Sequence, residues 1–241
     1  MLDLIGFSPI TAKFSFSVTF DLLTQFYGKS MAIFALTLVF SLPLGLVVCA
    51  FRRSKLKPVS LITKFYISIM RGTPLMLQLV VVWFGPSYIY RFIAQFFDSW
   101  PANATIPTSY RFWAVIIGFS INYAAYFAEI YRGGIEAVNK GQYEAAAVLG
   151  MNKMQTFFRI ILPQVIKIVL PSMTNETITL VKDTSLAFAI SYVEMFTTAK
   201  QCVTSQSSIL PLFVAGIFYY VTNFVIAILL GRAEKKMEYY S

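Results

Sequence analysis

The sequence is poor in the residues that most enzyme active sites use. It has no histidine in 241 residues and only two cysteines, Cys49 and Cys202. These absences exclude Ser-His-Asp and Cys-His nucleophiles, metal sites built on imidazole, and a disulfide framework. Charged residues make up 13% of the chain, against about 25% in soluble domains. Hydrophobic residues reach 57%, so the chain is predicted to lie in a membrane.

Five long apolar stretches predict five membrane-spanning helices, because a helix needs about 20 apolar residues to cross the hydrocarbon. No charged residue lies between Lys29 and Arg52, or between Arg71 and Arg91. The expected fold class is an all-α, multi-pass membrane protein. The predicted helices lie near residues 30–51, 65–90, 111–131, 157–182 and 208–231.

The parts of the chain outside the spans are assigned from composition. Residues 1–28 lack a basic cluster at their start, and Lys13 and Asp21 interrupt them, so they are not predicted to be a signal peptide. They are predicted to form an amphipathic segment near the outer membrane surface. Residues 29–232 are expected to form a single membrane domain, and residues 233–241 a cytoplasmic tail.

The basic residues are distributed unequally between the two sides of the membrane. Thirteen of the twenty Lys and Arg follow the first, third and fifth predicted helices, and five lie on the other side. By the positive-inside rule, the N-terminus is predicted outside and the C-terminus inside. The net charge of +9 is then explained by topology, and nucleic acid is not an expected partner.

A short helix is predicted in the loop between the third and fourth spans, residues 133–158. The helix-forming run extends from Tyr143 to Leu149 and stops at Gly150, and Asn152 can cap the helix that follows. Such a short helix is marginally stable alone. It is therefore expected to pack either on the membrane surface or on a partner.

The spacing in this loop resembles the EAA signature of permease subunits of ATP-binding-cassette importers. The residues that carry the resemblance are Glu144, Ala145, Ala146, Gly150, Ile160, Leu162 and Pro163. Four further segments are similar to the polar-amino-acid uptake subfamily, which includes histidine, glutamine and cystine permeases. They lie at residues 71–75, 129–135, 140–142 and 182–186.

The resemblance implies a type I importer permease fold in which this loop is a coupling helix seated in a groove of a cytoplasmic ATPase. The residues implied in that contact are Glu144, Ala145, Ala146, Gly150, Lys140 and Gly141. The implied partners are two ATPase subunits, a second permease subunit, an extracytoplasmic solute-binding protein, a polar amino acid and membrane lipid. The chain is implied to be no enzyme and to bind no cofactor, since ATP and Mg belong to the ATPase. The implied location is the bacterial inner membrane.

Polar residues inside the fourth span are candidate substrate contacts, because a charge at mid-membrane costs about 2.5–3.5 kcal/mol. Glu176, Thr179 and Asp183 recur on one helical face. The alternative is structural: a salt bridge or a water-exposed helix end, which is favoured for Lys182 and Asp183, and a packed helix interface for Asn122. The full set of candidates is Asn122, Asn175, Glu176, Thr179, Lys182, Asp183, Thr184 and Ser185.

Two prolines interrupt the fourth predicted helix. Pro163 and Pro171 are expected to kink or break it, because a proline inside a helix removes a backbone hydrogen bond. The polar run 172–177 follows directly, and any unwound backbone there is expected to be packed in protein or to line a cavity.

Two other functions compete with the importer interpretation. An ion-gradient-driven amino-acid transporter or a channel would also explain intramembrane charges, but it would not explain a docking helix with this spacing. No inverted internal repeat is visible either. A membrane-embedded enzyme would need a nucleophile or a metal cluster, and the lack of histidine argues against one.

Overall fold

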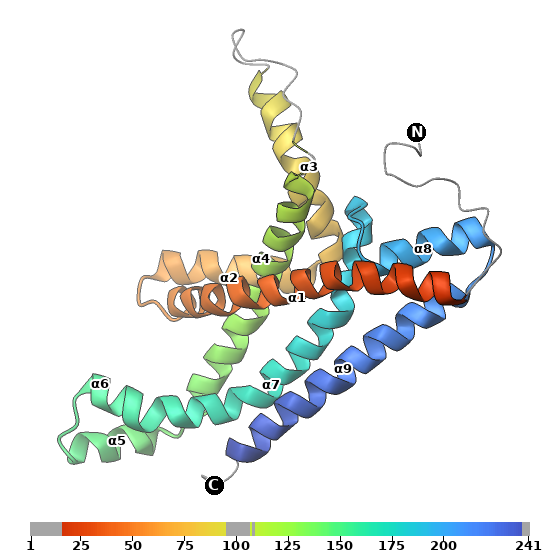
Figure 1. The fold of residues 1–241 in the computed structure, drawn as a ribbon. Coiled ribbons are helices and arrows are strands. Elements are labelled where there is room, and N and C mark those ends of the chain that lie inside the picture. Colours follow the sequence, from red (N-terminus) through yellow and green to blue (C-terminus); the bar gives the residue numbers. More distant parts are fainter. Residues whose placement is uncertain (1–15, 95–106, 108, 238–241) are drawn as a thin grey trace.

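The computed structural model describes residues 16–94, 107 and 109–237, which are helical almost throughout and contain no β-strand (Figure 1). The elements include a π-helix, η2, and a 3-10 helix, η3. In chain order they are α1 (Phe16–Arg52), α2 (Lys57–Gly72), α3 (Leu75–Ala94), α4 (Tyr110–Ala137), α5 (Lys140–Val148), α6 (Lys153–Thr156), η2 (Phe157–Ile161), α7 (Leu162–Asp183), η3 (Thr184–Ile190), α8 (Met195–Gln206) and α9 (Leu210–Met237).

Five helical stretches are long and apolar enough to cross a membrane, which confirms the predicted all-α, five-span fold class. The helix that contains the first span begins earlier than the predicted start near residue 30, at Phe16, and no proline interrupts the chain between the two positions. Residues 16–28 are therefore the first turns of α1 and not a separate segment. Residues 1–15 lie outside the described part of the chain.

The second predicted helix, residues 65–90, is two helices. α2 ends at Gly72, and Thr73 has an extended backbone with φ −120° and ψ 148°. The break is explained by Pro74, which disfavours a helical conformation in the residue before it. α3 then begins at Leu75.

The fourth span accommodates its two prolines differently. A π-helical turn, η2, precedes Pro163, and the Leu162 N–H bonds back to the carbonyl of Phe157. At Pro171 the prediction of a break was wrong, because α7 runs without interruption from Leu162 to Asp183. α7 buries side chains on both sides of this proline, so packing offsets the one lost hydrogen bond.

The helix α4 forms the centre of the core, with Phe119, Tyr123 and Phe127 almost completely buried. It packs against α1, α3 and α7. At the contact with α7, a Cβ on Gly134 would collide with the Val169 side chain, so the small residue permits the close approach of the two helices.

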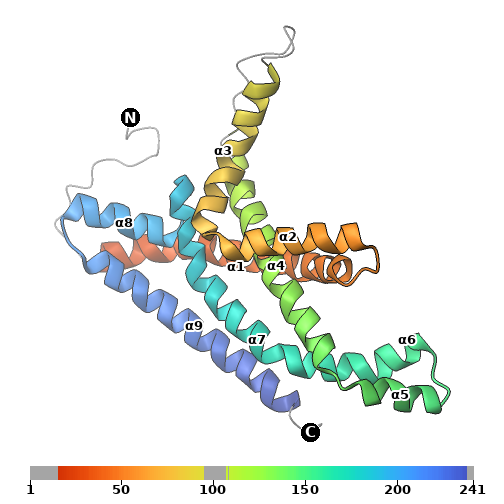
Figure 2. The same ribbon diagram turned by 180° about the vertical axis from the view of Figure 1, so that it is seen from behind.

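α5 and α8 lie at opposite ends of the molecule in both views (Figures 1 and 2). α8 lies between the start of α1 and the start of α9, whereas α5 and α6 form a hairpin between the end of α4 and the start of η2. The sequence did not predict α8.

Candidate functional site

A cavity of ≈ 360 Å³ lies between α4, α7 and the end of α2, and we call it the α4–α7 cavity. Its lining combines apolar side chains with charged groups. The lining residues are Arg71, Tyr126, Glu129, Ile130, Gly133, Gly134, Ile168, Val169, Ser172 and Glu176.

Two of the charged groups in the cavity have no ion-pair partner among the described residues. Glu129 is already paired, because its Oε2 lies 2.6 Å from an Arg132 nitrogen. The Arg71 guanidinium lies over the Tyr126 ring, 5.3 Å from its centroid, and makes no ion pair within the described ranges. Glu176 is likewise unpaired there. The α4–α7 cavity therefore presents one available cation and one available carboxylate.

Among the predicted substrate-path residues, Glu176 lines this cavity. Asp183 lies two turns farther along α7 and accepts a hydrogen bond of 2.8 Å from the Tyr123 hydroxyl. Asn122 is buried, and its side-chain nitrogen donates to the Met70 carbonyl and to Gln78 Oε1, both at 2.9 Å. Asn122 thus ties α4 to the junction between α2 and α3.

The remaining candidates do not line the α4–α7 cavity. Asn175 and Lys182 are exposed, and Thr179 is partly buried. The hydroxyls of Thr184 and Ser185 donate to backbone carbonyls three residues earlier, at 2.8 and 2.7 Å. The last two side chains therefore bond locally at the junction of α7 with η3.

The structure adds Arg71 to the candidate residues. Sequence reasoning treated Arg71 as one of the basic residues that orient the chain. The signal that could have identified it is its position three residues before Pro74, because a helix break within a span lets a cation point into the protein.

The helix α5 is closed at both ends by local hydrogen bonds. Asn139 caps its start by accepting from the Gly141 N–H at 2.8 Å. At its end, Gly150 has φ +72°, and the Gly150 and Met151 N–H groups donate to carbonyls of the last turn. This Schellman arrangement favours glycine, which adopts a positive φ without strain.

The α5–α6 hairpin exposes apolar side chains. Val148 is 88% and Leu149 76% exposed, whereas Ala146 is buried against the rest of the chain. Glu144 is exposed and has no ion pair among the described residues. The next helix starts with a reciprocal capping box between Asn152 and Gln155. The hairpin is therefore a locally defined unit with an uncovered apolar surface.

Residues 41–239 match the family described as the binding-protein-dependent transport system inner membrane component. The chain belongs to this family. The match spans most of the described helices, from within α1 through α9.

Relatives at about one-third identity cover most of the chain. A glutamine transport system permease protein, GlnP, of Rickettsia felis is 33% identical, with 90% of this chain and 98% of the relative covered. The arginine transport system permease protein ArtQ of Bacillus subtilis is also 33% identical, with 87% and 89% covered. The crystal structure of an amino acid ABC transporter with histidines matches with a TM-score of 0.75 at 29% identity, covering 90% of this chain and 94% of that one.

Membership in the family confirms the ABC permease interpretation, and the ion-gradient alternative is not favoured. Such permeases are multi-pass proteins of the bacterial inner membrane and are not catalytic themselves. They work with an ATPase and a substrate-binding protein in general.

Proposed function

We propose that this permease is half of the translocation path of an ATP-driven importer for polar amino acids, with its N-terminus outside and its C-terminus inside. The relatives named for glutamine and arginine transport support the substrate class. Two copies of the chain, or one copy and a related chain, are needed because five spans are too few to enclose a path. Two ATPase subunits hydrolyse the ATP, and a solute-binding protein delivers the amino acid.

The α4–α7 cavity is the proposed contact with the substrate. Every free amino acid carries an ammonium and a carboxylate, and this cavity presents the available Glu176 carboxylate and the available Arg71 guanidinium. Charge-assisted hydrogen bonds to the two groups would be strong because the site is partly buried. This pairing of opposite charges in one cavity is the observation that carries the proposal.

The α5–α6 hairpin is the proposed contact with the ATPase. Its exposed Val148 and Leu149 provide the apolar surface, and Glu144, Ala145, Lys140 and Gly141 lie on the same short helix. Gly150 fixes the turn that leads into α6. Movement of the ATPase subunits on binding ATP would pass through this hairpin to α4 and α7, which flank the cavity.

The experiment measures ATP hydrolysis by the permease–ATPase complex in lipid, in the presence of the complex's solute-binding protein. Glutamine, arginine, cystine and leucine are each tested as the added amino acid. We expect stimulation by a polar subset and not by leucine. Replacing Glu176→Gln or Arg71→Gln should reduce the stimulated rate about tenfold, the usual effect of losing one charge-assisted hydrogen bond. Uptake that follows an ion gradient without ATP would overturn the proposal.

Matched controls separate cavity contacts from general charge effects. Glu136→Gln removes an exposed carboxylate of α4 outside the cavity, and Arg53→Gln removes an exposed cation beside the end of α1. Neither should alter the stimulated rate by more than a small factor. Equal losses in the controls and the cavity variants would contradict the assignment of the α4–α7 cavity.

A further inference from the structure

A second cavity of ≈ 440 Å³ lies away from the α4–α7 cavity, between α1, the start of α4 and the turn after η3. We call it the basic pocket, because the described residues that line it include two cations and no carboxylate. The lining residues are Lys29, Ser109, Arg111, Phe112, Ser191, Tyr192 and Val193.

Both cations of the basic pocket are available to an anion. Neither Lys29 nor Arg111 forms an ion pair within the described residues. Arg111 is held in place by stacking over Trp83, 5.0 Å from its ring, and by one hydrogen bond of 3.1 Å to the Ser191 carbonyl. Its Nε is buried without an acceptor in the described part of the chain. The pocket thus holds a fixed guanidinium with unused donors.

The start of α4 adds to the positive potential of the pocket. Ser109 occupies the N-cap position, but its side chain makes no capping hydrogen bond. The N-terminus of a long helix attracts anions through its free N–H groups and its dipole. Lys29, Arg111 and this helix end therefore all favour a negatively charged ligand.

The depth of the basic pocket corresponds to one boundary of the membrane. Lys29 precedes Arg52 by 23 residues in α1, and Arg111 precedes Arg132 by 21 residues in α4. At 1.5 Å per residue these separations are about 35 Å and about 32 Å. The hydrocarbon core is about 30 Å thick, so Lys29 and Arg111 lie near one headgroup layer when the other two arginines lie near the opposite one.

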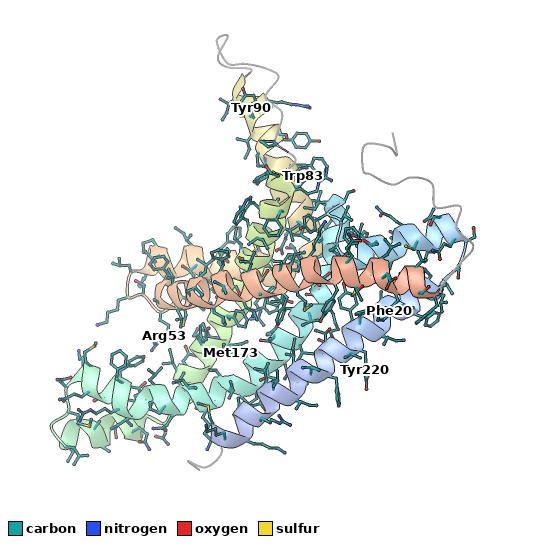
Figure 3. All side chains as sticks on the ribbon, in the orientation of Figure 1. Phe20, Arg53, Trp83, Tyr90, Met173 and Tyr220 are labelled. Carbon is teal, nitrogen blue, oxygen red and sulfur yellow. The ribbon has the colours of Figure 1, made fainter. Side chains whose placement is uncertain are left out.

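Apolar side chains continue from the pocket along α4. Trp113 is 50% exposed and Ile117, one turn farther into the span, is 40% exposed. Trp83, seen in Figure 3 where α3 lies beside the first turns of α4, supplies an aromatic ring at the same level. Cations next to aromatic rings, with an apolar strip leading inward, match a lipid with a charged headgroup and acyl chains.

We infer that the basic pocket binds the phosphate of an anionic phospholipid. The phosphate oxygens accept hydrogen bonds from Lys29 and Arg111, and an acyl chain lies along Trp113 and Ile117. A carboxylate of a partner protein would also suit the two cations, but it would not use the apolar strip. Because Arg111 also holds the Ser191 carbonyl, the bound lipid fixes the turn between η3 and α8.

The experiment measures lipid retention by native mass spectrometry of the permease–ATPase complex, extracted from vesicles of phosphatidylcholine and phosphatidylglycerol. We expect wild type to retain phosphatidylglycerol selectively. Lys29→Gln and Arg111→Gln should each reduce retention about fivefold, the effect expected for one basic residue at an anionic surface. Lys29 is exposed, so its variant tests the site even where loss of Arg111 disturbs folding.

Lys200→Gln and Arg91→Gln are the matched controls, because each removes an exposed cation that does not line the pocket. They should retain the lipid as wild type does. Retention that is equal in pocket and control variants overturns the inference. Displacement of the lipid by inorganic phosphate would instead indicate a small-anion site. Pocket variants that retain the lipid but no longer bind a solute-binding protein would indicate a protein-docking site. The phosphate result and the docking result would each overturn the assignment.

Discussion

The short helices α5 and α8 lie at opposite ends of the molecule and are held by different means. α5 is fixed by hydrogen bonds within residues 139–151, and of its own side chains only Ala146 is buried. α8 is fixed by a side chain that reaches other helices. Its N-cap residue, Glu194, is fully buried and accepts hydrogen bonds from Ser30 of α1 and Tyr219 of α9.

Both carboxylate oxygens of Glu194 accept hydrogen bonds. Oε1 accepts from the backbone N–H and the hydroxyl of Thr197, at 2.7 and 3.0 Å. Oε2 accepts from the Phe196 N–H at 2.8 Å and from Ser30 at 2.9 Å. The comparison therefore separates α5, which can move as a unit on its partner, from α8, which is tied into the helix bundle through Glu194. This difference suits α5 to coupling with the ATPase and α8 to supporting the helix bundle.

The largest expected effect is the loss of stability when the hydrogen bonds that hold α8 are removed. Glu194→Ala leaves several buried donors without acceptors, so we expect a loss of about 3–4 kcal/mol in the free energy of unfolding. The thermal-denaturation midpoint of the purified complex measures it. Glu136→Ala is the control, because that carboxylate is more than half exposed and, among the described residues, pairs only with Arg132. Similar midpoints for the two variants would show that α8 does not depend on this network.

The second effect is confined to the α5 end. Gly150→Val places a β-branched residue at φ +72°, which costs about 1–2 kcal/mol in this left-handed conformation. We expect faster amide hydrogen exchange in α5 and loss of substrate-stimulated ATP hydrolysis, with little change in the denaturation midpoint of the whole complex. Gly28→Val is the control, because it lies within α1 with no heavy atom within 4 Å of its added Cβ. Stimulation that survives in Gly150→Val would contradict the coupling role.

The same contrast explains what could be predicted from the sequence. The stop of α5 at Gly150 and the cap at Asn152 were predictable because both depend on neighbours within a few residues. The five spans were predictable because charge-free stretches of sufficient length have few alternatives in a membrane. Local chemistry and composition decide these features.

The features that were missed depend on residues distant in sequence. α8 has a polar composition, and its N-cap bonds to Ser30, 164 residues away. The continuity of α7 through Pro171 depends on packing against neighbouring helices, which a proline rule does not include. Arg71 belongs to the α4–α7 cavity only because the break at Thr73 brings the end of α2 beside α4 and α7. Tertiary contacts decide these features.

The smallest expected effect is the pH dependence of stability at the α8 end, which the α5 end should not share. Burial raises the pKa of the Glu194 carboxyl above its ordinary value, although its hydrogen bonds oppose the rise. The folded state therefore holds this proton more tightly than the unfolded state does. Its stabilising contribution is fully present below the ordinary glutamate pKa and is lost as the pH rises through the raised value. Within the described part of the chain, the other titratable groups near this carboxyl are Tyr192 and Tyr219.

When a single proton is involved, the free energy of unfolding cannot change by more than about 1.4 kcal/mol per pH unit. We expect the denaturation midpoint of wild type to fall as the pH rises within this window. Glu194→Gln should be less stable at every pH, because its amide NH₂ faces donors, but it should lose this part of the slope. No ionisable side chain of α5 is buried, so Glu144→Gln at the other end should keep the wild-type slope. A slope unchanged in Glu194→Gln would mean that another group titrates, and α8 would then be held by a carboxylate that stays ionised throughout.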